Sequence, residues 1–228
     1  MKRFYSVMMI YLIVLSFVVV SVKLTRAYDG RYAGGGSFRY ILDAGHGIPD
    51  GGAVGVDGTT EQELNLKLVL KIQEGLVQKN ISALLTREDQ NGIYTEGKSI
   101  LDQKISDIKN RVKLLSQYSE IPVISIHMNS FTDPSVHGIQ VFYKDGDSPS
   151  MELAKKLQER INAVIQPENT KGIKRIPSNV YLFSHIPNAS VLLECGFVSN
   201  REELEKLKDD AYLQDISEVI TEVLAANC

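Results

Sequence analysis

Four ionisable side chains stand at positions where packing alone would select apolar residues. His46 follows a short apolar run in the stretch DAGHG, His127 ends PVISIH, and Glu194 ends VLLE. Glu61 begins a stretch with helical periodicity. Two imidazoles and a carboxylate are the ligand set of a catalytic zinc site, which keeps a fourth position open for water. The remaining carboxylate, that of Glu194, is then free to act as a general base.

Each of these signals is weak when it is taken alone. A lone histidine is more often a hydrogen-bonded structural residue than a metal ligand, and a carboxylate in the first turn of a helix usually complements the macrodipole. The grouping is stronger, because three of the four groups lie at the carboxyl ends of predicted strands, where ligand sites form in α/β sheets. His137 and His185 lie in loop-like contexts, and we interpret both as structural residues or substrate contacts at most.

Alternating strands and helices must position these groups. Short apolar runs predict strands at 39–43, 82–87, 122–127, 138–143, 180–183 and 191–194. Apolar residues at helical spacing predict a helix with Glu61 in its first turn and further helices at 105–117, 153–164 and 216–223. Ser199 and Glu202 form a capping-box pattern for a helix starting near Asn200. We therefore predict an α/β fold, with a mostly parallel twisted sheet flanked by helices on both faces.

The amino-terminal segment has the layout of an export signal. A run of 19 uncharged, mostly apolar residues, 4–22, lies between basic residues on both sides. Its length suits either a cleaved signal peptide or a membrane anchor, and both place the remaining chain across the cytoplasmic membrane. We predict a signal or anchor at 1–27, a glycine-rich flexible tether at 28–37 and one catalytic domain at 38–228.

Composition excludes several classes of protein. With 43% hydrophobic residues and two cysteines among 228, the chain is neither disordered nor a disulfide scaffold. Four of its 25 Lys and Arg but none of its 28 Asp and Glu lie in residues 1–27, so the remainder has a net charge of −7. An acidic domain without a basic cluster argues against a nucleic-acid partner.

We expect Cys195 to be a small buried hydrophobic residue that points away from Glu194, and assign Cys228 no role.

Five ordered stretches resemble the motifs of the third family of zinc-dependent N-acetylmuramoyl-L-alanine amidases: DAGHG at 43–47, GVDGTTEQELNL at 55–66, LTRED at 85–89, SIHMNS at 125–130 and LECGFVSN at 193–200. The resemblance covers essentially all of 38–228. It implies one zinc ion per chain, held by His46, Glu61 and His127, with Glu194 as the catalytic carboxylate. Ala44 stands where the family usually has proline, and Ile48 where it often has glycine, which predicts a differently shaped loop after His46.

The resemblance also implies the reaction. Zinc would activate a water and polarise the scissile carbonyl, while Glu194 takes the proton and returns it to the leaving amine. The bond cleaved would be the amide between the lactyl group of N-acetylmuramic acid and L-alanine in peptidoglycan. Candidate substrate-binding residues are Arg87, Asn129, Lys174 and Arg175. Arg87 has an equally good interpretation as an ion-pair partner of Glu88, Asp89 or Asp43. Because the chain lacks tryptophan, Tyr143 and Tyr181 are the candidates for apolar contact with the sugar.

Two further stretches, QVFY at 140–143 and KRIPSNVYL at 174–182, resemble the germination-specific subgroup that acts on spore cortex peptidoglycan. That resemblance implies that the protein acts together with a peptidoglycan N-deacetylase in making muramic-δ-lactam. It also implies a location between the spore membranes, where a membrane anchor or a lipoprotein partner would hold the protein. Three alternatives stay open: a general cell-wall autolysin, a zinc peptidase acting on stem peptides, and a catalytically silent wall-binding or spore-assembly module.

Overall fold

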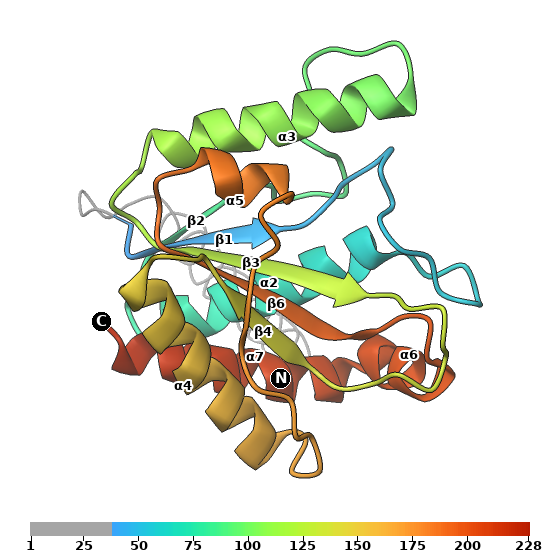
Figure 1. Cartoon of the computed structure of the whole chain (residues 1–228), viewed down its shortest axis with the longest axis vertical. Coiled ribbons are helices and arrows are strands. Elements are labelled where there is room, and N and C mark those ends of the chain that lie inside the picture. Colours follow the sequence, from blue (N-terminus) through green and yellow to red (C-terminus); the bar gives the residue numbers. More distant parts are fainter. Residues whose placement is uncertain (1–37) are drawn as a thin grey trace, which may run out of the picture. The chain divides into compact units, whose positions relative to one another are not determined.

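Six strands form one sheet in the computed structural model, which describes residues 38–228 (Figure 1). The strand order is β2-β1-β3-β6-β4-β5. The strands are β1 (Tyr40–Ala44), β2 (Ala83–Leu85), β3 (Val123–Asn129), β4 (Gln140–Tyr143), β5 (Lys174–Arg175) and β6 (Ser190–Phe197). Strands β2, β1, β3 and β6 are parallel, whereas β4 runs antiparallel to β6 and carries β5 beside it. The mostly parallel sheet is therefore confirmed.

Helices cover both faces of this sheet, also as predicted. They are α2 (Glu61–Gln78), α3 (Ile100–Ser116), α4 (Ser148–Val164), α5 (Tyr181–His185), α6 (Arg201–Lys208) and α7 (Asp210–Ala226). Helices α2, α4 and α7 pack together on one face with α6 at its end, and α3 lies with α5 on the other (Figure 1). The predicted signal or anchor and the tether lie outside the described residues. Within residues 38–228, no helix has the length and apolar character needed to cross a bilayer.

Alternation along the strands divides the core into two parts. Leu42 and Leu193 belong to the larger core, under α2, α4 and α7, while their neighbours Ile41 and Leu192 belong to the smaller core, under α3 and α5. Cys195 is fully buried in the larger core, and its neighbour Glu194 faces the other side of the sheet. Burial raises the pKa of the Cys195 thiol. The predicted role of Cys195 as a buried hydrophobic residue is confirmed.

Residues 180–183 correct one element of the prediction. They do not form a strand, because Tyr181–His185 is the short helix α5, whose Leu182 and Phe183 pack into the smaller core. A run of four apolar residues has the same pattern in a buried strand and in one buried helical turn, so only the tertiary packing distinguishes them. Strands β3 and β6 also continue beyond His127 and Glu194, to Asn129 and Phe197, so these two residues lie within their strands rather than at the ends.

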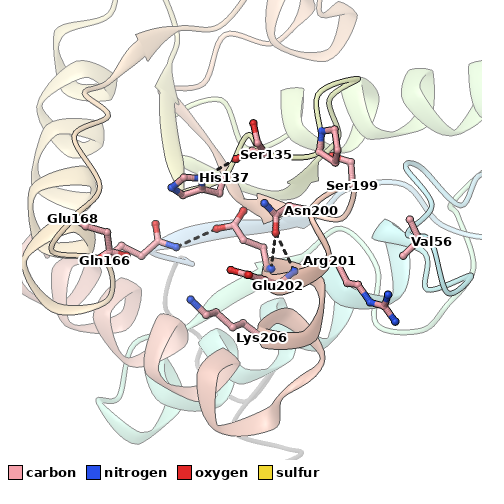
Figure 2. Close-up of a pocket in the computed structure, with 12 residues that line it drawn as sticks. Val56, Ser135, His137, Gln166, Glu168, Ser199, Asn200, Arg201, Glu202 and Lys206 are labelled. Carbon is pink, nitrogen blue, oxygen red and sulfur yellow. Dashed lines mark hydrogen bonds between the residues drawn. The ribbon is translucent and has the colours of Figure 1, made fainter.

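The predicted capping box of α6 is also wrong. The N-cap is Asn200, whose side chain accepts hydrogen bonds from the backbone N–H groups of Glu202 and Glu203 (Figure 2). The Ser199 hydroxyl instead accepts a hydrogen bond from the backbone N–H of Phe131, in the loop after β3. Asparagine and serine are comparable caps, and the helix begins one residue later than the Ser199 pattern requires.

A buried ion pair joins α3 to the central strands. Arg111 of α3 bonds to the Asp43 carboxylate on β1, which also accepts hydrogen bonds from Ser125 and Thr86. Burial alone would raise the pKa of Asp43, but Arg111 and the two hydroxyls outweigh it and lower this pKa to about 2. Arg111 also donates to the backbone carbonyls of Ala44 and His46, so this ion pair fixes the turn that carries His46.

We expect Arg111→Ala to lower the free energy of unfolding by about 3–5 kcal/mol, because it leaves the Asp43 carboxylate buried and uncompensated. Urea denaturation of the purified domain measures this, with the exposed Lys113→Ala on the same helix as the control. The wild-type carboxylate should stabilise the fold fully above its unfolded pKa of about 4 and lose that effect as the pH falls towards 2. Equal free energies of unfolding for Arg111→Ala and Lys113→Ala would contradict a stabilising role of the Asp43–Arg111 ion pair.

Candidate metal and catalytic site

The Glu61 carboxylate lies between two imidazole rings. Its Oε2 is 3.2 Å from His46 Nε2, and its Oε1 is 2.8 Å from His127 Nδ1. One ligand atom from each of the three residues lies within 4.8 Å of the others. The structure therefore brings together the three residues that the sequence predicted as metal ligands.

The loop after β1 turns His46 towards this point. His46 has a φ of 61°, in the left-handed region that few non-glycine residues adopt. Arg111 holds this conformation by donating to the His46 carbonyl, and the Gly45 N–H donates to the Ile126 carbonyl on β3. Gly45 has to be glycine, because a Cβ atom there would lie 2.2 Å from the His127 ring. The close approach of the two chain segments thus sets the separation of the two histidines.

Glu61 is fixed by the start of α2 as well as by the histidines. Its Oε2 accepts a hydrogen bond from the Ala53 N–H at 2.8 Å, and its Oε1 accepts one from the Met128 N–H at 3.2 Å. One turn further along α2, the buried Asn65 donates to the Gly45 carbonyl at 3.1 Å and to Glu61 Oε1 at 3.4 Å. The carboxylate therefore has one orientation relative to the loop, the helix and β3.

Opposite charges dominate the electrostatics of the three residues. Burial alone would lower the pKa of His46, but its hydrogen bonds to Asp50 and Glu61 raise this pKa to about 9. Burial alone would raise the pKa of Glu61, but the two histidines hold it well below its usual range. The buried carboxylate thus attracts positive charge, which either protons or a metal cation supplies.

The donor chemistry of this group fits zinc. His46 uses Nδ1 to bond to the Asp50 carboxylate at 2.8 Å, which leaves Nε2 directed at Glu61. A ligating histidine typically has a carboxylate on its second nitrogen in this way. His46, Glu61 and His127 would hold the ion, as nitrogen, oxygen and nitrogen donors.

Glu194 lies beside His127 on the neighbouring strand. The two residues are register partners across β3 and β6, which places both on the face of the sheet that α3 and α5 cover. Glu194 Oε2 is buried and has no hydrogen-bond partner among residues 38–228. Burial raises the pKa of Glu194 to about 7. A buried carboxylate with a free oxygen and such a pKa can exchange a proton with a reacting molecule near neutral pH.

A cavity of about 180 Å³ adjoins His46 and His127. Its walls also include Gly45 and Asp50 of the loop after β1 and residues of α3 and α5, such as Ile108 and Phe183. Tyr181 is 43% exposed at this cavity and stacks on His185 with ring centroids 3.8 Å apart. The mispredicted segment 180–183 thus forms part of the cavity wall.

A family model described as N-acetylmuramoyl-L-alanine amidase matches residues 41–226. The chain belongs to this amidase family. A germination-specific N-acetylmuramoyl-L-alanine amidase of Bacillus subtilis is 31% identical over 180 residues, which cover 78% of this chain and 75% of the relative. The amidase AmiA of Escherichia coli is 26% identical over 82% of this chain and 75% of its own length. The sequence resemblance to amidases is therefore confirmed.

Solved structures of amidases have the same fold. The CwlD amidase from Clostridioides difficile, solved in complex with the GerS lipoprotein, aligns with a TM-score of 0.78 and 34% identity, over 84% of this chain and 97% of that one. An N-acetylmuramoyl-L-alanine amidase from Clostridium difficile 630 aligns with a TM-score of 0.71 and 25% identity, over 83% and 96% of the two chains. The chain is thus a peptidoglycan amidase with one α/β domain.

Two of the predicted substrate-binding residues are engaged within the amidase fold. Arg87 is buried, and its guanidinium donates to four backbone carbonyls, those of Ala44, Gly45, Gln62 and Asp89. Asn129 ends β3, and its side chain accepts a hydrogen bond from the Ser130 N–H. Both stay predictions as substrate ligands, and Arg87 supports the loop after β1 through these backbone contacts.

Lys174 and Arg175 form β5 at the edge of the sheet, and both side chains are exposed. Arg175 lies 3.2 Å from Asp145 and lines a hollow of about 480 Å³. Phe183 lines this hollow and also the cavity beside the histidines, so the two spaces share a wall. Lys174 is not among the residues that line either space, and both residues stay predictions as substrate contacts.

A larger and more polar hollow, of about 720 Å³, lies beside the start of α6. Figure 2 shows His137 at this hollow with its Nδ1 bonded to the Ser135 carbonyl. Neither His137 nor His185 belongs to the group that could hold a metal, in agreement with the interpretation of both as structural residues or substrate contacts.

Sequence reasoning did not select Asp50, Asn65 or Arg111 for the site. Asp50 and Asn65 each lie four residues after a predicted ligand, the spacing of one helical or loop turn. Arg111 lies on the apolar face of α3, three residues after Ile108, where a charged residue needs a buried partner. That break in the apolar pattern was the available signal, but the identity of the partner, Asp43, depends on the fold.

We expect Gly45→Ala to weaken metal binding at least tenfold, because the added methyl group displaces the His127 ring. Metal analysis after dialysis of the zinc-loaded domain measures this effect. Gly172→Ala is the matched control, since a Cβ atom there meets nothing within 4 Å. Wild-type zinc content in Gly45→Ala would show that the ring does not need this space.

Proposed function

We propose that this amidase is a zinc hydrolase that cleaves the amide between the lactyl group of N-acetylmuramic acid and L-alanine. The observation that carries the proposal is the buried Oε2 of Glu194, which has no hydrogen-bond partner within residues 38–228. It lies on the strand beside His127, next to three residues with a zinc donor set. When bound, zinc supplies a Lewis acid that polarises the scissile carbonyl and acidifies the attacking water.

The protein's own residues orient the reaction and move the proton. Glu194 accepts the proton of the attacking water at its Oε2 and delivers it to the nitrogen of L-alanine as the amide bond breaks. Its buried position keeps the pKa near 7, so the carboxyl group serves as base and then as acid at neutral pH. Residues of α3 and α5 form walls of the cavity that adjoins the two histidines.

Within the family, we infer a role in spore cortex maturation. The relative named for germination supports this, as do the stretches QVFY and KRIPSNVYL, which lie in β4 and from β5 to α5. The enzyme would trim stem peptides so that a peptidoglycan N-deacetylase can prepare muramic-δ-lactam. A general cell-wall autolysin is the alternative, since the matching relatives include amidases whose names do not mention germination, such as AmiA of Escherichia coli.

We also propose export across the cytoplasmic membrane and a lipoprotein partner. The basic and apolar layout of residues 1–27 supports export, to the space between the spore membranes in the cortex role. The similar CwlD amidase was solved with the GerS lipoprotein, which supports a partner of that kind here.

We expect Glu194→Ala to reduce amide hydrolysis at least about 100-fold while zinc content stays unchanged, because a general base contributes on that scale. Mass spectrometry of digested peptidoglycan measures freed lactyl groups and freed L-alanine amino groups. The control is Glu63→Ala, an exposed carboxylate of α2. Activity within a few-fold of wild type would exclude Glu194 as the base. A zinc peptidase would instead shorten stem peptides, and a silent module would leave peptidoglycan intact.

We expect His127→Ala to lower the zinc content of purified residues 28–228 well below one ion per chain, because one of three protein ligands is lost. The control is His137→Ala, whose exposed side chain lies outside the ligand group. If both variants bind zinc equally, then His127 is not a ligand. Activity of wild-type 28–228 alone would show that no partner is needed for catalysis.

A further inference from the structure

The second ring nitrogen of His46 is held by a residue that neither the family motifs nor the comparisons assign. Asp50 Oδ2 lies 2.8 Å from His46 Nδ1. An ionised carboxylate only accepts hydrogen bonds, so Nδ1 carries the proton in this contact. Nε2, which lies 3.2 Å from Glu61 Oε2, is then the atom left to bind a metal.

Four further contacts, with three residues, hold Asp50 itself in place. Its backbone forms a reciprocal pair with Gly47, with N–H to carbonyl distances of 2.9 and 3.1 Å. The Gly52 N–H donates to Asp50 Oδ1 at 3.2 Å, and the Lys104 ammonium of α3 lies 3.0 Å from Oδ2. The carboxylate is therefore oriented from its own loop and from α3.

The loop that carries Asp50 also packs tightly against the ligands. Gly52 has a φ of 69°, and a Cβ atom there would lie 2.5 Å from Glu61 Oε2 and 2.8 Å from His46 Cδ2. The segment from Asp50 to Gly52 thus packs against the His46 ring, and a shift of Asp50 would be transmitted to the ring.

We propose that Asp50 is a positioning residue of the metal site, which fixes the His46 ring in the tautomer and orientation that present Nε2 to the ion. This inference rests on the proposed zinc function. It assigns Asp50 no contact with the substrate or with the metal. Its effect on the reaction passes through His46.

The test is the zinc affinity of Asp50→Asn, measured by competition with a chromogenic chelator. An asparagine amide can take two orientations here. With its NH2 group at His46, it opposes the Nδ1 proton and the Lys104 ammonium, which are both donors. With its NH2 group at Gly52, it opposes the Gly52 N–H, which is also a donor. We expect zinc binding to weaken about 10- to 100-fold. The visible spectrum of the cobalt-substituted protein should also change, because the ring no longer holds one orientation.

Two controls separate positioning from loss of charge. Asp57→Asn neutralises a carboxylate of the same glycine-rich loop that pairs with Lys208 and does not contact His46, so zinc affinity should stay at the wild-type value. In a His46→Ala background, Asp50→Asn should produce no further loss, because the ring through which Asp50 acts is absent. If Asp50→Asn lowers zinc affinity as much in the His46→Ala background as it does when His46 is present, a simple charge effect explains the loss and the proposal is overturned.

Folding and the proposed function are checked separately. Urea denaturation of the zinc-free variants shows whether Asp50→Asn folds, and Asp50→Ser, too short to reach Nδ1, gives a second truncation with the same expected loss of zinc affinity. Wild-type zinc affinity and cobalt spectrum in folded Asp50→Asn would overturn this inference alone. Failure of the wild-type protein to bind zinc would instead overturn the proposed function.

Discussion

The contact of one buried carboxylate with two imidazoles is the interaction on which the site depends. Glu61 starts α2, His127 lies within β3, and His46 follows β1, so this contact joins three separate parts of the chain. A buried carboxylate is costly unless it is paired, and here both oxygens have partners. The rest of the domain serves to bring these three residues to one point near the carboxyl ends of β1 and β3.

A second set of buried charges supports the first. Asp43 and Arg111 link β1 to α3, and Arg111 with Arg87 occupies the carbonyl groups of the turn around Gly45 and His46. These cations replace the regular hydrogen bonds that the irregular turn cannot make. An unusual backbone conformation at His46 is therefore compatible with a stable fold, and the ligand has a defined direction.

Much of the fold and of the site was predictable from local pattern. Strand runs and helical periodicity located β1, β3, β6, α2 and α7, because buried strands and amphipathic helices have different apolar spacing. The prediction failed for 180–183, where four apolar residues form one helical turn, and for the cap of α6, where adjacent Ser199 and Asn200 are both good caps. In both cases the alternatives have nearly the same local energy, and packing selects between them.

The sequence by itself determined the residue types and order of the site: two histidines, Glu61 and a second carboxylate, each next to an apolar segment. Its ordered motifs also determined the family. Only the tertiary structure decided which partners hold them, namely Asp50 on His46, Asn65 on Glu61, and Arg111 on the turn between. The physical reason differs between them. Arg111 reaches the turn from 65 residues away in sequence, so that contact depends on how the fold packs α3 against β1. Asp50 and Asn65 are each only four residues from their partners, but the loop conformation and the contact of Asn65 with the Gly45 carbonyl orient them, and a residue pattern does not encode either.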